Sequence, residues 1–304
     1  MVVSGDKCHK SNICRYCVYQ GSRPFASFRP VRGLVASFRA AGSGVSGASA
    51  CQLKGRALPD FLPGVPADAV HSALSRAPGN ELASGKFDSP ESSAALAANA
   101  FGWFLDRPAL LPALPGVPMG RPDIVELEAE MRFPWSGGRH PWLDAALTTA
   151  TTLVGVESKR YEPFRPGKAT TFSEAYDSRE WGPGMAGYDA LRAALSDGRL
   201  AYRHLDAVQL VKHAYGLRTQ AQKRARGAVL VYLHAAPAAW ANGKLLDPAA
   251  IRAHAAEVRD FAARVKGQDV TFAALRWADL LKQWAGVPAL ADHAAAITAR
   301  FGVI

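Results

Sequence analysis

One short stretch of the sequence has residue types and a spacing that suit metal-assisted hydrolysis. Glu157 and Lys159 are separated by one residue and follow the apolar run Leu153–Val156. Side chains two positions apart in a strand emerge on the same face. Asp144 lies near the start of the preceding expected strand, and an antiparallel hairpin would bring it beside Glu157. A carboxylate pair with an adjacent ammonium group is therefore expected at one end of a hairpin.

This trio predicts the hydrolysis of phosphodiester bonds. Two carboxylates and an oxygen from the chain or from water suit Mg²⁺ or Mn²⁺, which prefer hard oxygen ligands. The metal would polarise a phosphoryl oxygen and lower the pKa of an attacking water. Lys159 would place a positive charge near the developing negative charge, and would help to position or deprotonate the water.

The elements that must position these residues can be read from hydrophobic periodicity. Apolar residues alternate with polar ones from Val125 to Phe133, which predicts a strand with one buried face. A turn at 135–139 separates it from expected strands at 143–149 and 151–159. Upstream, Ser89 and Pro90 suit the N-cap and first position of a helix.

Helices and strands alternate through the rest of the sequence. We expect helices at about 185–196, 205–217, 248–265, 277–285 and 288–300, and strands at 228–234 and 270–275. A helix, three antiparallel strands, a helix and a further strand form an α/β layered domain with a mixed sheet.

The pattern Asp144, twelve intervening residues, then Glu157-Ser158-Lys159 resembles the PD-(D/E)XK nuclease superfamily. The element order resembles its restriction-endonuclease-like αβββαβ core, a mixed sheet flanked by helices, over roughly residues 80–235. The N-terminal segment and the C-terminal helical additions lie outside this resemblance. The superfamily's Pro-Asp pair is not intact, because Leu143 precedes Asp144. Pro122-Asp123 is a literal pair, but it opens the first strand, so Asp123 is held in reserve.

The resemblance also implies further site residues. The second core helix of the superfamily often carries a polar residue near the site, and Gln209 is the first candidate, with Lys212 and His213 on the same helix face. An acidic residue before or on the first core helix often joins the metal, and Glu81 or Glu91 could do so.

Each of these added residues has an ordinary alternative. Gln209, Lys212 and His213 could simply form a solvated helix face. Glu162, three residues beyond Lys159, is a further candidate to contact the metal or the water. Glu126, Glu128 and Glu130 form an acidic face that would normally be solvated, although one of them could reach the metal cleft.

Composition and charge separate the first part of the chain from the rest. The net charge is +10, and residues 1–60 hold nine Lys/Arg against two Asp. Residues 1–75 are rich in Gly, Ser, Ala and Arg, so we expect them to be mostly disordered, and 76–304 to form the nuclease-like domain. All four cysteines lie within the first 51 residues, which favours a reducing, cytoplasmic location. Three alternatives stand for this segment: a transit peptide, a metal-binding tail around Cys14 and Cys17, and an over-extended start of translation that has no function of its own.

Two further groups of residues could contact a nucleic acid. A basic cluster follows the Gln209 helix, and three aromatic side chains could stack on bases. The basic residues are Lys212, Arg218, Lys223, Arg224 and Arg226, with Arg160, Arg165 and Lys168 nearby, and the aromatic residues are Trp181, Tyr188 and Tyr202. Solvated loops and core packing are the ordinary fates of such residues.

The sequence thus predicts a nuclease that cleaves DNA with Mg²⁺ or Mn²⁺. Asp144 and Glu157, joined by Glu81, would hold the metal, and Lys159 and Gln209 would complete the site. No phosphate loop, dinucleotide fingerprint, HExxH motif or transmembrane run is present. A role in genome defence or DNA repair and a homodimer would be consistent. The rival readings are a nucleic-acid-binding protein of this fold without cleavage and a protein in which Glu157 and Lys159 are an ordinary ion pair.

Overall fold

A mixed five-stranded sheet forms the centre of the folded unit. The computed structural model describes residues 59–79, 81–135, 137–167, 170–177, 179, 181–302 and 304. The sheet has the order β1-β2-β3-β4-β5, in which β1, β2 and β3 are antiparallel neighbours and β3, β4 and β5 are parallel. The strands are β1 (Ile124–Glu130), β2 (Trp142–Thr148), β3 (Thr152–Lys159), β4 (Gly227–His234) and β5 (Val270–Arg276). The expected α/β class and mixed sheet are confirmed.

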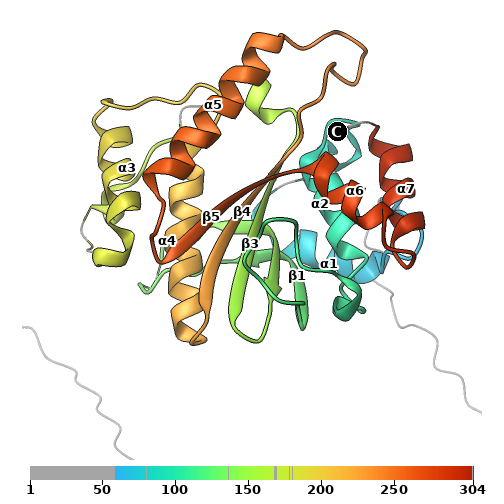
Figure 1. Ribbon diagram of the computed structural model, residues 1–304, viewed down its shortest axis with the longest axis horizontal. Helices are drawn as coiled ribbons and strands as arrows, with labels where there is room; N and C mark the ends of the chain where they lie inside the picture. Colours follow the sequence, from blue (N-terminus) through green and yellow to red (C-terminus); the bar gives the residue numbers. More distant parts are fainter. Residues whose placement is uncertain are drawn as a thin grey trace, which may run out of the picture. The chain divides into compact units, whose positions relative to one another are not determined.

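Helices cover both faces of the sheet (Figure 1). One face is covered by α1 (Ala67–Arg76), α2 (Ser93–Gly102), α6 (Trp277–Ala285) and α7 (Ala291–Phe301). The other face is covered by α3 (Ala186–Ser196), α4 (Ala207–Lys223) and α5 (Pro248–Arg264). Short 3₁₀ turns in the described part of the chain span Lys86–Asp88, Pro108–Leu110, Glu162–Phe164, Glu174–Tyr176 and Pro183–Met185. Two apolar cores result, one on each side of the sheet.

Side-chain caps begin α2, α4 and α5, and the boundaries of α2 and α4 differ from those expected. α2 is capped by Ser92, whose hydroxyl accepts from the Ala95 N–H, and not by Ser89. Ser89 instead accepts from the Glu91 N–H in the preceding turn. α4 is capped by Asp206 and continues to Lys223, beyond the expected end at 217, because residues Leu217 and Ala221 remain buried against the sheet.

The alternating residues of β1 do not share one buried face. Val125 and Leu127 pack in the core under α1 and α2, whereas Ala129 and Met131 pack in the core under α4. The change of face occurs at Glu128, which has a left-handed backbone conformation with φ of +49°. A non-glycine residue in this region is unusual and shifts the direction of the side chains that follow it. The expectation of a single buried face is therefore wrong beyond Leu127.

Part of the segment that its composition marks as mostly disordered is folded. α1 lies within residues 1–75, and its Val70, Ala73 and Leu74 are buried against the sheet core. Residues 1–58, which include all four cysteines and the basic N-terminal charges, lie outside the described residues, as does Lys168. Among the helices that are described, none is long and apolar enough to cross a bilayer.

Gly216 allows α4 to lie close to the chain that links β1 and β2. A Cβ at this position would lie 2.5 Å from the backbone oxygen of Met131 and 3.0 Å from Pro141. We expect Gly216→Ala to lower the free energy of unfolding by about 2 kcal/mol, because backbone atoms must move apart. Chemical denaturation of this variant checks the prediction. Gly286→Ala is the matched control, since its Cβ would come no closer than 3.4 Å to another atom, the Gln283 oxygen. An equal loss in both variants would contradict this account.

Candidate active site

The three residues that the motif singles out lie together at the end of the β2–β3 hairpin. β2 and β3 pair with Ala145 opposite Val156, which places Asp144 beside the end of β3. The Asp144 Oδ2 accepts a hydrogen bond from the Ser158 N–H at 2.6 Å. The Lys159 Nζ lies 2.5 Å from the Glu157 Oε1. The hairpin geometry expected from the sequence is therefore confirmed.

These three residues form a mutually dependent set of charges in which Glu157 is buried and Asp144 and Lys159 are half-buried. Only 3 % of the Glu157 side chain is exposed, so its carboxylate depends on Lys159 for compensation. Burial, and then the charge of Glu157, raise the pKa of Asp144 well above its usual value, although Lys159 and the Ser158 N–H oppose this. Burial alone lowers the pKa of Lys159, but Glu157, Asp144 and Glu162 more than reverse this and raise it. Lys159 is therefore a cation, and without a metal it is not a base.

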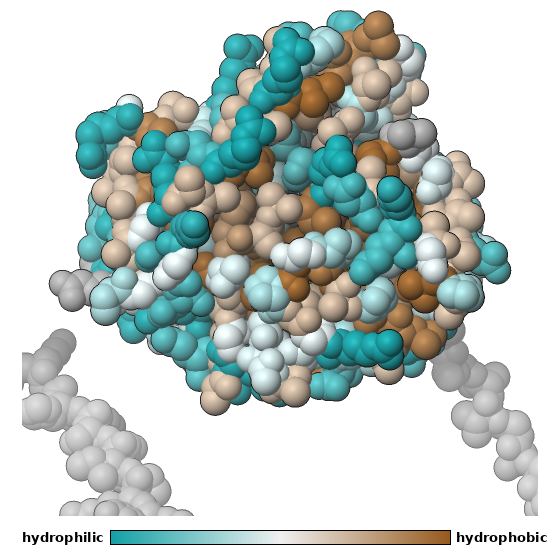
Figure 2. Space-filling model, in the orientation of Figure 1, coloured by the Kyte–Doolittle hydropathy of each residue, from teal (hydrophilic) through white to brown (hydrophobic). Residues whose placement is uncertain are grey.

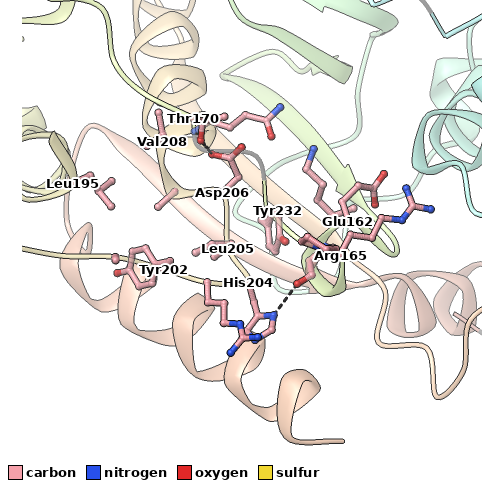
Figure 3. Close-up of a pocket in the computed structure, with 18 of the residues that line it drawn as sticks. Glu162, Arg165, Thr170, Leu195, Tyr202, His204, Leu205, Asp206, Val208 and Tyr232 are labelled. Atoms are coloured by element: carbon pink, nitrogen blue, oxygen red, sulfur yellow. Dashed lines mark hydrogen bonds between the residues drawn. The ribbon is translucent and has the colours of Figure 1, made fainter. Parts of the chain in front are cut away.

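A pocket of about 580 Å³ opens beside Lys159 (Figure 3). The start of α4, the turn after β3 and the segment before α4 form its walls, and Lys159, Glu162 and Gln209 lie among its lining residues. Because Lys159 belongs to both the carboxylate set and the pocket wall, a molecule in the pocket would lie next to the charged groups.

The residues present fit a hard divalent cation. Two carboxylates close together raise the pKa of Asp144, and a bound cation would relieve this repulsion. Within the described residues no group of three Asp, Glu, His or Cys side chains is already gathered around one point. A site with two carboxylates, completed by water or a backbone carbonyl, is the arrangement that Mg²⁺ commonly uses. Asp144 and Glu157 are the residues that would hold it.

Residues 43–302 match a protein family described as restriction endonuclease associating with ARP (REase-ARP). The match spans the whole sheet, the helices on both faces and the Asp144–Glu157–Lys159 set. The chain belongs to the REase-ARP family. This membership agrees with the restriction-endonuclease-like fold expected from the order of elements. No curated protein and no solved structure matches the chain.

In this REase-ARP domain, α4 presents a different residue to Glu157 from the one the resemblance favoured. The His213 Nε2 lies 3.6 Å from the Glu157 Oε2, and only 2 % of the His213 side chain is exposed. Burial lowers the pKa of His213, so it is neutral at pH 7. Its Nδ1 has no hydrogen-bond partner in the part of the chain that the structure describes. Gln209 lies one turn earlier, in the pocket wall, and its side chain has no partner among the described residues. His213 is therefore not part of a solvated face.

Lys212 holds a loop and does not approach the carboxylates. Its Nζ donates to the Thr171 carbonyl at 2.7 Å and lies over the rings of Phe172 and Tyr176. The i, i+3 and i+4 spacing therefore grouped three residues that have three different neighbours.

Of the three glutamates Glu126, Glu128 and Glu130, one of which was expected to be able to reach the metal cleft, Glu128 lies beside the site. β1 and β2 pair with Leu127 opposite Ala145 and Ala129 opposite Leu143, so Glu128 lies across from Asp144. Burial, followed by the charges of Glu157 and Glu81, raises the pKa of Glu128 to about 7. Its carboxylate has no hydrogen bond or ion pair within the described residues. The position of Glu128 opposite Asp144 in the β1–β2 register could have identified it from the sequence. Its left-handed backbone conformation has no signal in the sequence.

The other acidic candidates lie at different distances from the site. Glu81 is close enough to raise the pKa of Glu128. Glu91 forms an ion pair with Arg165 at 2.5 Å and is used in packing. Glu162 accepts from the Arg160 N–H at 2.8 Å and contributes to the charge around Lys159. Asp123 begins β1 beside Thr148, at the far end of β2 from Asp144, so the reserve assignment is unsupported.

The basic residues do not form one surface beside this site. Arg160 is 3 % exposed and donates to the carbonyls of Pro90 and Phe301, so it joins α7 to the turn before α2. Arg224 and Arg226 follow the C-terminal end of α4, next to the start of β4, and are thus at the opposite end of the strands from Lys159. Figure 2 shows hydrophilic side chains interspersed with apolar ones on this view of the surface.

Two of the three aromatic candidates belong to the core. Trp181 stacks on Tyr215 with ring centroids 4.1 Å apart, and Tyr188 is fully buried and donates to the Val270 carbonyl. Tyr202 differs, because it is partly exposed and lines the pocket beside Lys159. It is the one candidate still placed to contact a ligand.

Proposed function

We propose that this chain is a metal-dependent nuclease of the PD-(D/E)XK type that hydrolyses phosphodiester bonds in DNA. The observation that supports this most is the juxtaposition of Asp144, Glu157 and Lys159 beside a pocket, in a member of a restriction endonuclease family. Mg²⁺ or Mn²⁺, when bound, would supply Lewis acidity for the phosphoryl group and a lowered pKa for the attacking water.

The chain's own residues prepare the site for this reaction. The Ser158 N–H fixes the Asp144 carboxylate, so its free oxygen is held in place before a ligand binds. In the metal-free protein the neighbouring carboxylates raise the pKa of Lys159 and keep it protonated. A positive charge at this position would stabilise the negative charge that develops on the phosphoryl oxygens. His213 lies beside Glu157 and restricts the movement of its carboxylate. Because His213 is neutral, it adds no positive charge that would repel a metal cation.

A panel of substrates tests this function. Supercoiled plasmid, linear duplex, single-stranded DNA and RNA are incubated with the full chain in Mg²⁺, in Mn²⁺ and in EDTA. We expect cleavage of DNA that requires a metal. Binding of DNA without cleavage by the folded protein in either metal would contradict the nuclease and favour a binding protein of the same fold.

A further inference from the structure

The pocket beside Lys159 has a size and a shape that go beyond what the hydrolysis of a phosphate requires. Its volume of about 580 Å³ falls in the range of sites that enclose small molecules. Figure 3 shows Leu195, Leu205, Val208 and Tyr202 around one part of it, with Glu162, Arg165 and Tyr232 around another. Apolar side chains and the rings of Tyr202 and Tyr232 thus lie in the same pocket as the Lys159 ammonium group.

Most charged groups in the pocket wall already have an ion-pair or hydrogen-bond partner. Arg165 is paired with Glu91 at 2.5 Å. Asp206 caps α4 and also accepts from the Thr170 hydroxyl at 2.8 Å. Glu162 accepts from the Ser93 hydroxyl at 2.5 Å as well as from the Arg160 N–H. A wall with balanced charges does not attract a run of phosphates, which requires a net positive groove.

Two polar side chains in the wall keep their hydrogen-bonding capacity. The Gln209 amide and the Arg203 guanidinium have no side-chain partner among the described residues. The amide offers two donors and an acceptor beside Lys159. Arg203 is exposed, so its charge is available at the pocket's surface. A molecule that fits this pocket would have a flat, apolar part with hydrogen-bonding groups on its edge for the Gln209 amide. It would also carry an anionic group outside the pocket, near Arg203.

We propose that this pocket receives one unstacked nucleobase of the strand that is cut. The proposal rests on the proposed function, since the pocket's occupant must be part of the substrate that reaches Lys159. Tyr202 and the leucine side chains contact the faces of the base, Gln209 bonds its edge, and Arg203 contacts an adjacent phosphate. Enzymes that work on nucleic acids use such pockets for bases removed from the stack, and aromatic contacts of this kind accept any base.

The test compares probes with and without bases. Fluorescein-labelled dT20 and a 20-mer of abasic tetrahydrofuran nucleotides are titrated with the full chain in EDTA, so that cleavage does not interfere. We expect wild type to bind dT20 about tenfold more tightly than the abasic probe, the effect of one base–aromatic contact. Ala201 is exposed and lines the pocket, so Ala201→Trp fills the space without disturbing the core and should abolish the preference.

Three further variants separate the contributions. Gln209→Ala should reduce the preference for dT20, whereas Arg203→Ala should weaken binding of both probes by the same factor. Ala299→Trp, at an exposed position of α7 on the other side of the sheet, should change neither. Equal affinity of wild type for both probes, or a preference that survives Ala201→Trp, would overturn the proposal. DNA cleavage together with equal probe affinities would support the nuclease and refute the base-binding pocket. A base preference without metal-dependent cleavage would support the pocket and refute the nuclease.

Discussion

Lys159→Ala should reduce the rate of DNA cleavage by about 10²–10³-fold while Mn²⁺ binding remains measurable. Loss of one fixed group that stabilises developing charge has an effect of this size. Metal binding persists because Asp144 and Glu157 supply the ligands, and removal of a neighbouring cation does not weaken their attraction for a metal. Single-turnover cleavage and calorimetry on the same preparation measure the two properties.

Folding must be controlled in this experiment, because Lys159 compensates the buried Glu157 carboxylate. Lys159→Arg keeps the charge and should retain the folded state, while a displaced guanidinium should still slow cleavage. Lys282→Ala, at an exposed position of α6 on the other side of the sheet, is the matched control and should cleave like wild type. Unchanged cleavage by folded Lys159→Ala would remove Lys159 from the mechanism.

Glu128→Gln should stabilise the metal-free protein at pH 8 by up to about 3 kcal/mol. The pKa of Glu128 is raised to about 7 from a usual value of 4.5, and each pKa unit corresponds to about 1.4 kcal/mol. The folded protein holds this proton between pH 4.5 and pH 7 while the unfolded chain has lost it. Wild type therefore loses stability as the pH rises through this window, and the loss is complete above pH 7. The glutamine variant has no such loss.

Urea denaturation in EDTA at several pH values checks this prediction. The stability difference between Glu128→Gln and wild type should be small near pH 4 and should grow to its full size by pH 8. Glu126→Gln is the matched control on the same strand, since Glu126 is exposed, and it should show no pH-dependent gain. A difference that stays constant with pH would contradict the assignment of the effect to the buried charge.

The parts of this site that follow from short-range pattern were predictable. Glu157 and Lys159 share a face because a strand has a period of two, and Asp144 reaches them because two adjacent strands form a hairpin. The same local signals placed β5 and α6 close to their observed bounds. These features depend only on residues near one another in the chain.

The features that escaped prediction depend on contacts between distant segments or on backbone conformation. The φ of +49° at Glu128 divides β1 between two cores, and no residue type there signals it. His213, not Gln209, lies beside Glu157 because packing against the sheet fixes the rotation of α4. Arg160 follows Lys159 directly, yet it is buried because it donates to Phe301, which lies 141 positions later.

The most direct measurement of the proposed site combines cleavage and metal binding in Glu157→Gln. The substitution keeps the size and hydrogen-bonding shape of the side chain and removes its charge. We expect Mn²⁺-dependent cleavage of plasmid and single-stranded DNA by wild type, and the loss of both cleavage and tight Mn²⁺ binding in the folded variant. Wild-type rates of metal-dependent cleavage in Glu157→Gln would show that the chemistry takes place elsewhere and would contradict this assignment.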